Sequence, residues 1–303
     1  MIELNGLSKR YGDTLAVDDL TFDVRPGCVT GFLGPNGAGK TTTMRIILGL
    51  DAPTKGTALV NGKPYGQIKF PLHEVGALLD AKALHGGRKA FDHLLCLAQS
   101  NNIGRARVAT VLELVGLGDV ANKRAGTFSL GMGQRLGIAA AMLGDPGTLM
   151  FDEPVNGLDP EGIVWIRTLL RGLAAEGRTV FISSHLMTEM AMTADRLIVV
   201  GRGHLIADAT VEEFTSRGEQ WVRVRSPHQR ELIAALQRAG GIVTSASIGD
   251  DSDVRGLKAG QIGDIALAAG IAIHGLTEHR ASLEEVFFGL TDDSVEYHGS
   301  VNA

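Results

Sequence analysis

The sequence has little cysteine, few aromatic residues and no long apolar run. Its two cysteines, Cys28 and Cys96, are too few for a disulfide framework and indicate reduced thiols in a cytoplasmic protein. The longest apolar run, from Leu136 to Gly144, is far shorter than the roughly 20 residues that a transmembrane helix requires. No apolar segment near the N-terminus resembles a signal peptide. We therefore expect a soluble chain without a membrane span of its own.

The sequence also lacks a cluster of positive charge. Its formal net charge is −5, and Lys and Arg do not gather in any one segment, which argues against a nucleic-acid partner. Aromatic residues make up only 5% of the chain, so Ala, Val, Leu and Ile must fill the core. A length of 303 residues is enough for one large domain or two unequal ones.

One segment, residues 34–41, fits the pattern G-x-x-x-x-G-K-S/T of a phosphate-binding loop. Its glycines allow backbone N–H groups to turn toward phosphate oxygens. The apolar run 29–33 predicts a buried strand before the loop, and segment 41–47, which lacks Gly and Pro, predicts a helix after it. The alternative is a glycine-rich turn that binds no ligand, but such a turn requires neither the strand before it nor the helix after it. The residues expected to contact a nucleotide are Gly34, Pro35, Asn36, Gly37, Ala38, Gly39, Lys40, Thr41 and Thr42.

Charged and hydroxyl side chains beside this loop suit ATP and Mg²⁺. Lys40 would bring its positive charge to the β- and γ-phosphates, and the Thr41 hydroxyl could ligate Mg²⁺. Asp152 and Glu153 follow the apolar segment 148–151, so Asp152 could hold the metal and Glu153 could polarise an attacking water. Such a pair at a strand end is also a common helix cap. The phosphate loop upstream favours the catalytic interpretation.

A third feature, Ser129-Leu130-Gly131, precedes a predicted helix. Ser129 fits a plain helix N-cap, and its hydroxyl together with the Gly131 N–H equally fits a γ-phosphate site. One chain cannot easily bring two helix N-termini onto one nucleotide. A two-fold dimer, in which each subunit covers the nucleotide of the other, removes this difficulty.

The order of the predicted elements indicates an α/β fold. Short apolar runs bounded by turns alternate with helical patterns, which predicts a mostly parallel sheet covered on both faces. Strands 2–7 and 20–24 alternate apolar and polar residues and should be half-buried. The predicted buried strands are 29–33, 75–79, 148–151, 179–183 and 197–200.

The sequence divides into parts of different pattern. Helical spacing dominates between two of the buried strands, and short strands with amphipathic helices follow Arg217. The predicted parts are a nucleotide-binding domain over 1–217, its helical insert at about 88–145, an accessory α+β domain over 218–291 and a polar tail over 292–303. The last strand of the accessory domain is expected at 271–275. This domain has no clustered catalytic residues, which favours a regulatory or dimerisation role.

Taken in order, these motifs resemble the ATP-binding cassette (ABC) ATPases over about residues 2–215. The resemblance implies a P-loop NTPase fold with a helical subdomain, ATP hydrolysis with Mg²⁺, and a nucleotide-sandwich dimer with a second copy or a related ABC chain. The implied catalytic residues are Lys40, Glu153 and His185, the last as the switch histidine. The further implied site residues are Tyr11 for stacking on adenine, Ser129 and Gly131 of the signature, Asp159 of the D-loop, and Thr41, Asp152 and Asp80 around the metal.

The weaker members of this set have simpler interpretations. Tyr11 could be an exposed turn aromatic, His185 a polar residue at a strand end, and Asp159 a turn residue or helix N-cap. Asp80 stands where the family usually has the glutamine of its Q-loop. It could approach the metal as a third carboxylate or turn outward to cap a local turn.

Departures from the usual family pattern indicate one branch of the family. Leu130 replaces the usual glycine of the signature, Met132 stands where glutamine is frequent, and Asp80 replaces the Q-loop glutamine. Together with the C-terminal domain, these features are similar to ABC ATPases of two-component exporters of drugs, antibiotics and other amphipathic compounds. In that branch the permease is a separate polypeptide, so the resemblance implies a peripheral protein on the cytoplasmic face of the membrane.

Two other functions remain open. A soluble ABC ATPase in translation or DNA maintenance would carry two cassettes or a long coiled coil, and neither pattern is present. A nucleotide-binding switch with little turnover is the other alternative, and the intact Glu153 argues against it.

Overall fold

The strand that leads into the phosphate loop lies inside a six-stranded sheet. The computed structural model describes residues 1–81, 83–245 and 251–291. The strand order is β5-β6-β7-β3-β8-β9, and all pairs are parallel except that of β8 with β9. Every residue of β3 and β7 is buried, as in sheets that are covered on both faces. The predicted α/β sheet is therefore confirmed. The strand bounds are β3 Val29–Leu33, β5 Val75–Leu78, β6 Thr148–Asp152, β7 Thr179–Ser183, β8 Arg196–Gly201 and β9 His204–Thr210.

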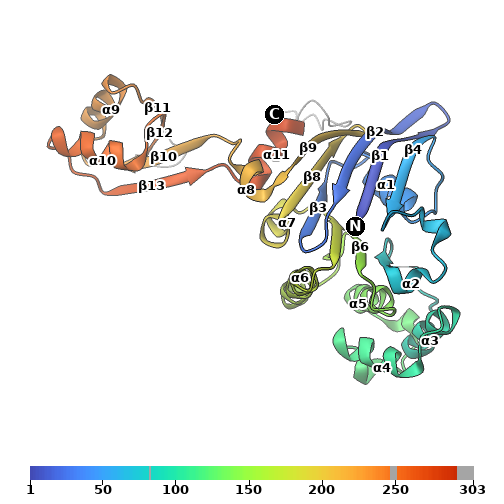
Figure 1. Ribbon diagram of the computed structural model, residues 1–303. Helices are drawn as coiled ribbons and strands as arrows, with labels where there is room; N and C mark the ends of the chain where they lie inside the picture. Colours follow the sequence, from blue (N-terminus) through green and yellow to red (C-terminus); the bar gives the residue numbers. More distant parts are fainter. Residues whose placement is uncertain (82, 246–250, 292–303) are drawn as a thin grey trace, which may run out of the picture. The chain divides into compact units, whose positions relative to one another are not determined.

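A second sheet of three antiparallel strands lies over one face of the first (Figure 1). Its order is β2-β1-β4, from β1 (Ile2–Tyr11), β2 (Thr14–Val24) and β4 (Lys55–Val60). The first two strands are longer than predicted, because Gly12, with φ of 56°, and Asp13 make a two-residue turn between Tyr11 and Thr14.

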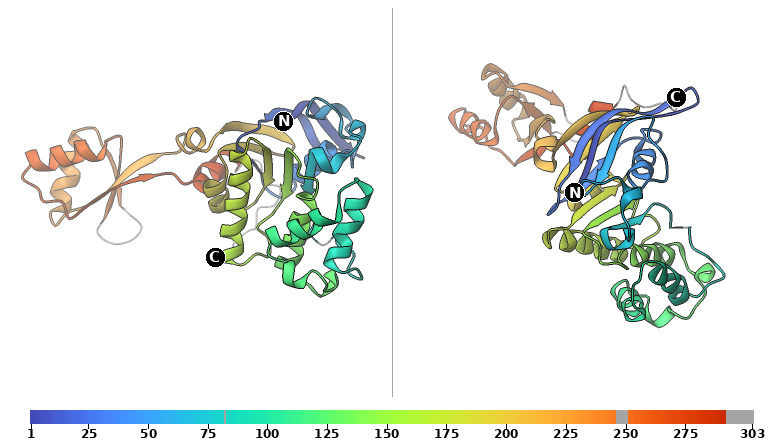
Figure 2. Two further views of the ribbon diagram at one scale, coloured as in Figure 1. Left: turned by 60° about the horizontal axis from the view of Figure 1, so that its bottom comes forward. Right: turned by 45° about the vertical axis from the view of Figure 1, so that its right-hand side comes forward.

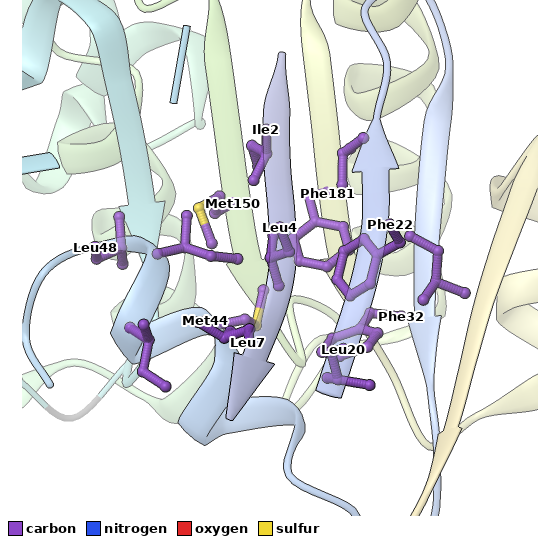
Figure 3. Packing of buried hydrophobic residues seen from close by; sticks show 14 of the residues in the cluster. Ile2, Leu4, Leu7, Leu20, Phe22, Phe32, Met44, Leu48, Met150 and Phe181 are labelled. Atoms are coloured by element: carbon purple, nitrogen blue, oxygen red, sulfur yellow. The ribbon is translucent and has the colours of Figure 1, made fainter. Parts of the chain in front are cut away.

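The main core fills the space between these two sheets. Phe22 of β2, Phe32 of β3 and Phe181 of β7 pack together with ring centroids 5.1 to 6.1 Å apart (Figure 3). Met44 of α1 (Lys40–Ile47) belongs to the same buried cluster. The helix that begins at the phosphate loop is therefore anchored in the core.

Helices cover the opposite face of the six-stranded sheet (Figure 2). The helices in this part of the chain are α2 Pro71–Glu74, α3 Ala90–Ser100, α4 Arg105–Leu114, α5 Leu130–Ala141, α6 Pro160–Ala175 and α7 Met187–Thr193. α5 packs on β5 and also contacts α3 and α4. The contact with β5 is close, because a Cβ atom at Gly137 would lie 2.5 Å from Leu78 Cδ1 and one at Gly76 would collide with the Ala141 carbonyl. α5 thus connects the helical part to the sheet.

The C-terminal part has its own sheet and core. The element order is β10 (Gln220–Arg225), α9 (Gln229–Arg238), β11 (Ile242–Ser245), β12 (Ser252–Arg255), α10 (Ala259–Ala268) and β13 (Gly275–Arg280). The antiparallel sheet has the order β11-β12-β10-β13, which is the split βαβ arrangement of ferredoxin-like domains. Val222, Val224, Leu232, Leu236 and Ile262 are at the centre of its core.

The last strand was predicted a few residues too early in the chain. β13 begins at Gly275, whereas the expected strand was 271–275, and Ile271 and Ile273 pack beside the core from the preceding loop. β13 is an exposed edge strand of polar sequence, and its pairing with β10 from Gln220 to Arg225 fixes it. Apolar alternation could not reveal such a strand.

The chain forms two compact units, Met1–Val211 and Glu212–Gly289. Two short helices, α8 (Val211–Thr215) and α11 (Leu283–Thr291), lie near the ends of the second unit. The predicted polar tail over 292–303 lies outside the described residues. Throughout the part of the chain that is described, no helix has the length and apolar character needed to cross a bilayer.

Candidate active site

The phosphate loop joins β3 to α1 through backbone that requires glycine at three positions, Gly34, Gly37 and Gly39. Gly37 and Gly39 have φ of 82° and 96°, values that favour glycine. A Cβ atom at Gly39 would collide with the carbonyl of Ala16, and one at Gly34 would lie 2.5 Å from the carbonyl of Val200. Because α1 begins at Lys40, the free N–H groups of its first turn face the loop. This geometry suits an anion with several oxygens.

Lys40 is enclosed by the loop. Its side chain is 8% exposed, and Nζ donates hydrogen bonds of 2.6 Å to the Gly34 carbonyl and 3.1 Å to the Pro35 carbonyl. Burial lowers the pKa of Lys40, and the nearby carboxylates of Glu153 and Asp152 oppose this shift. The ammonium and the two carboxylates therefore lie within electrostatic reach of one another.

Asp152 connects the end of β6 to α1 and β7. Thr41 Oγ1 donates a 2.9 Å hydrogen bond to Asp152 Oδ2, and Ser183 Oγ of β7 donates to Asp152 Oδ1. Sequence reasoning identified Thr41 and Asp152 but missed Ser183, which is fully buried. The signal in the sequence that could have identified Ser183 is its hydroxyl at the end of a mainly apolar strand.

The residues present fit a Mg²⁺ ion. Thr41 Oγ1 and Asp152 Oδ2 are adjacent oxygen donors of the kind that Mg²⁺ prefers. Among the described residues, no group of three or more His, Cys, Asp and Glu side chains is arranged to hold a metal. This agrees with a Mg²⁺ site that takes one or two protein oxygens and completes its shell with phosphate and water.

Glu153 follows Asp152 in a left-handed backbone conformation. Its φ is 52°, a region that residues other than glycine seldom occupy. Its N–H donates to the carbonyl and Oγ of Ser183, at 3.2 and 3.1 Å. His185 Nδ1 lies 2.8 Å from Glu153 Oε2. Lys40, Thr41, Asp152, Glu153 and His185 are therefore gathered where β3, β6 and β7 end.

The signature residues lie in a different environment. Ser129 caps α5, and its Oγ accepts a 3.2 Å hydrogen bond from the Met132 N–H. Gly131 packs against the next loop, since a Cβ atom there would lie 2.7 Å from the Gly157 carbonyl. Asp159 caps α6 by accepting a 2.9 Å hydrogen bond from the Gly162 N–H. The structure thus brings signature and D-loop residues together within one chain.

Tyr11 lies beside α1. It is 45% exposed, its OH donates a 2.9 Å hydrogen bond to Asp51 Oδ2, and Lys9 Nζ lies 4.7 Å from the ring centroid. Desolvation and Asp51 raise the pKa of Tyr11, while the neighbouring Thr42 opposes this. Tyr11 and Thr42 therefore lie close together near the phosphate loop.

Asp80 is not gathered into a carboxylate cluster. It is exposed just after β5, and its carbonyl accepts a 3.1 Å hydrogen bond from the Ala83 N–H. The described residues contain no metal-competent group that would join it to Asp152 and Glu153.

Comparison with known proteins agrees with this geometry. A family model described as ABC transporter matches residues 17–156, and a domain of unknown function matches residues 220–284. The bacitracin transport ATP-binding protein BcrA of Bacillus licheniformis is 34% identical over 96% of this chain and 97% of its own length. The lantibiotic transport ATP-binding protein SrtF of Streptococcus pyogenes is 33% identical over 69% of this chain and 90% of its own.

A solved structure has the same fold. The dimeric structure of MJ0796, a bacterial ABC transporter cassette, superposes with a TM-score of 0.64 at 25% identity and covers 70% of this chain and 99% of that one. Together with the loop, strand-end and signature geometry, these similarities assign the chain. It belongs to the ABC transporter family, as an ATP-binding subunit that hydrolyses ATP.

Proposed function

We propose that the chain powers an exporter by binding and hydrolysing ATP with Mg²⁺ at the end of β3, β6 and β7. The observation that carries this proposal is the convergence of Lys40, Thr41, Asp152, Glu153 and His185 from separate elements. Each has a side chain suited to one part of phosphoryl transfer, a reaction that depends mainly on positioning and electrostatic stabilisation.

Each residue then has a distinct role. Lys40 holds the β- and γ-phosphates, replacing bonds that its ammonium makes to loop carbonyls. Thr41 and Asp152 would hold Mg²⁺, which when bound would neutralise part of the negative charge of the phosphates. Glu153 accepts hydrogen bonds from the attacking water, and His185 fixes the orientation of its carboxylate. Tyr11 provides the exposed aromatic ring for adenine.

The complete site requires a second subunit. Ser129 and Gly131 mark the N-terminus of α5, a helix of 12 residues, and such an end favours negative charge. Within this chain their contacts run to Met132 and Gly157. In a two-fold dimer they would cover the γ-phosphate of the nucleotide on the other subunit, with Asp159 of the D-loop close by. The dimeric cassette that superposes on this fold supports such an arrangement.

The substrate class follows from the relatives. Those named for bacitracin and lantibiotic transport support peptide antibiotics, or other amphipathic drugs, as the exported compounds. We propose that a separate permease carries the substrate path and that this chain binds it on the cytoplasmic face of the membrane. Residues 1–217 act as the nucleotide-binding domain with a helical insert at about 88–145, and 218–291 form an accessory domain.

Expression with the membrane protein of the neighbouring reading frame tests this function. In a sensitive host, the pair should raise the inhibitory concentration of bacitracin or a lantibiotic, and Lys40→Ala should abolish this protection. Lys63→Ala is a matched control, because Lys63 is an exposed lysine in the turn after β4, outside the phosphate loop and away from Tyr11. ATP turnover without any effect on export, together with no binding to the membrane protein, would favour a soluble ABC ATPase instead.

A further inference from the structure

The strained backbone of Glu153 is held from two sides. β7 holds its N–H through the carbonyl and hydroxyl of Ser183. From the other side, Gln134 Nε2 of α5 donates a 3.2 Å hydrogen bond to the Glu153 carbonyl. A non-glycine residue with a φ of 52° keeps this conformation only where its surroundings determine it. Gln134 is therefore part of what defines the direction of the Glu153 side chain.

Gln134 is suited to this task by its burial. The side chain is 3% exposed, and a buried amide that loses its partner is costly. The carbonyl of Glu153 also accepts a 3.2 Å hydrogen bond from the Asn156 N–H. Two donors thus fix the peptide that follows Glu153, and only Gln134 contributes one from a distant element.

α5 also packs against the residues that follow Glu153. Gly157 has a φ of 77°, and a Cβ atom there would collide with the Leu130 side chain. Gly131 packs against the Gly157 carbonyl in turn. The first two turns of α5 and the loop from Glu153 to Gly157 therefore move together or lose these contacts.

We propose that Gln134 is a positioning residue for hydrolysis, which directs the Glu153 carboxylate through the hydrogen bond to the Glu153 carbonyl. This inference rests on the proposed role of Glu153 in polarising water. Ser129 begins the same helix, so the hydrogen bond also makes the direction of Glu153 depend on the position of α5. In the dimer, α5 of one subunit would contact the nucleotide bound by the partner. Through Gln134, the position of that helix would then affect hydrolysis of the nucleotide bound by its own subunit.

A double-mutant cycle with Glu153 tests the assignment. Gln134→Met keeps the side-chain volume and removes the donor, and we expect kcat to fall about 5- to 50-fold, as for the loss of one buried hydrogen bond. The dissociation constant of ATP should stay within about twofold, because the hydrogen bond of Gln134 runs to the Glu153 carbonyl and Lys40 and the phosphate loop are unchanged. In the Glu153→Gln background, Gln134→Met should have no further effect, since the group it directs is already disabled. Gln99→Met, at an exposed position of α3, is the matched control.

The outcomes distinguish a failure of the positioning role of Gln134 from a failure of the proposed role of Glu153. Near-normal turnover of Glu153→Gln alone overturns both. A severe loss in Glu153→Gln, with the full Gln134→Met effect repeated on top of it, overturns the positioning role alone. If Gln134→Met does not fold, as judged by thermal unfolding and ATP binding, Gln134→Asn replaces it in the same cycle. Its amide is one methylene too short for the bond, so the same loss and the same non-additivity are expected.

Discussion

His185 Nδ1 and Glu153 Oε2 lie 2.8 Å apart at the ends of two neighbouring parallel strands. A carboxylate can only accept, so Nδ1 carries the proton of this hydrogen bond. In the neutral ring Nε2 is then the acceptor. The pair therefore has one defined tautomer and one defined carboxylate orientation, and both should affect catalysis.

The first prediction concerns the charge of Glu153. Glu153→Gln keeps the shape but removes the negative charge, so hydrolysis should fall roughly 10²- to 10⁴-fold. ATP binding should persist, because Lys40 and the loop are unchanged, and an ATP-dependent dimer should remain on size exclusion. Glu113→Gln, at an exposed position of α4, is the control. Turnover close to that of the control would remove Glu153 from the mechanism.

The second prediction concerns His185. Its side chain is 52% exposed, against 22% for Glu153, so His185→Ala should leave the fold intact. Turnover should decrease about 10- to 100-fold, because the carboxylate loses its orienting donor. Steady-state ATPase rates measure this, and His204→Ala on β9 is the control. Independent, additive losses in the double variant with Glu153→Gln would show that the two residues do not act as a unit.

Most of the candidate site could be predicted from the sequence. A phosphate loop is a local pattern, and the carboxyl ends of parallel strands meet at one edge of a sheet. From these facts Lys40, Asp152 and Glu153 could be expected to lie near one another, and the structure places them so. The parallel sheet could be predicted because its strands are short, mainly apolar runs that alternate with helical patterns.

The remaining features depend on tertiary contacts. Nothing local to Gln134 or Ser183 shows that both bond to the backbone of Glu153. The last strand was predicted too early because the residues of β13 are mostly polar and only pairing with β10 defines it. Asp80 follows a buried strand, and a strand end fixes the backbone but leaves the side-chain direction to its neighbours, so the two roles expected for Asp80 stay predictions.

The third prediction distinguishes the role of Asp152 as a metal ligand from the role of Asp80. Asp152→Asn should raise the Mg²⁺ concentration needed for half-maximal ATPase activity at least about tenfold, because a charged oxygen ligand is lost. Asp80→Asn should shift it by less than about twofold, since Asp80 is not clustered with Asp152 and Glu153. Mg²⁺ titrations at fixed ATP measure both. Equal shifts in the two variants would place Asp80 at the metal.

The fourth prediction tests the shared site. Lys40→Ala disables the phosphate loop, and Ser129→Arg blocks the helix end that would cover the partner's nucleotide. Each variant alone should be inactive. A mixture should regain activity, because a heterodimer keeps one site with both halves intact. Mixing must be verified with two affinity tags. Inactivity of a verified heterodimer would argue against a site shared between subunits.

The last prediction concerns the C-terminal unit, which has a core of its own. Leu236 is fully buried there, so Leu236→Ala should destabilise this unit by about 2–5 kcal/mol. Leu267→Ala, at a side chain that is 81% exposed on α10, should change its stability by less than about 0.5 kcal/mol. ATP affinity should be the same in both variants, because the residues of the candidate site all lie in the other unit. Thermal unfolding and ATP titration measure the two quantities. A folded Leu236→Ala protein with weakened ATP binding would show that the C-terminal unit influences the nucleotide site.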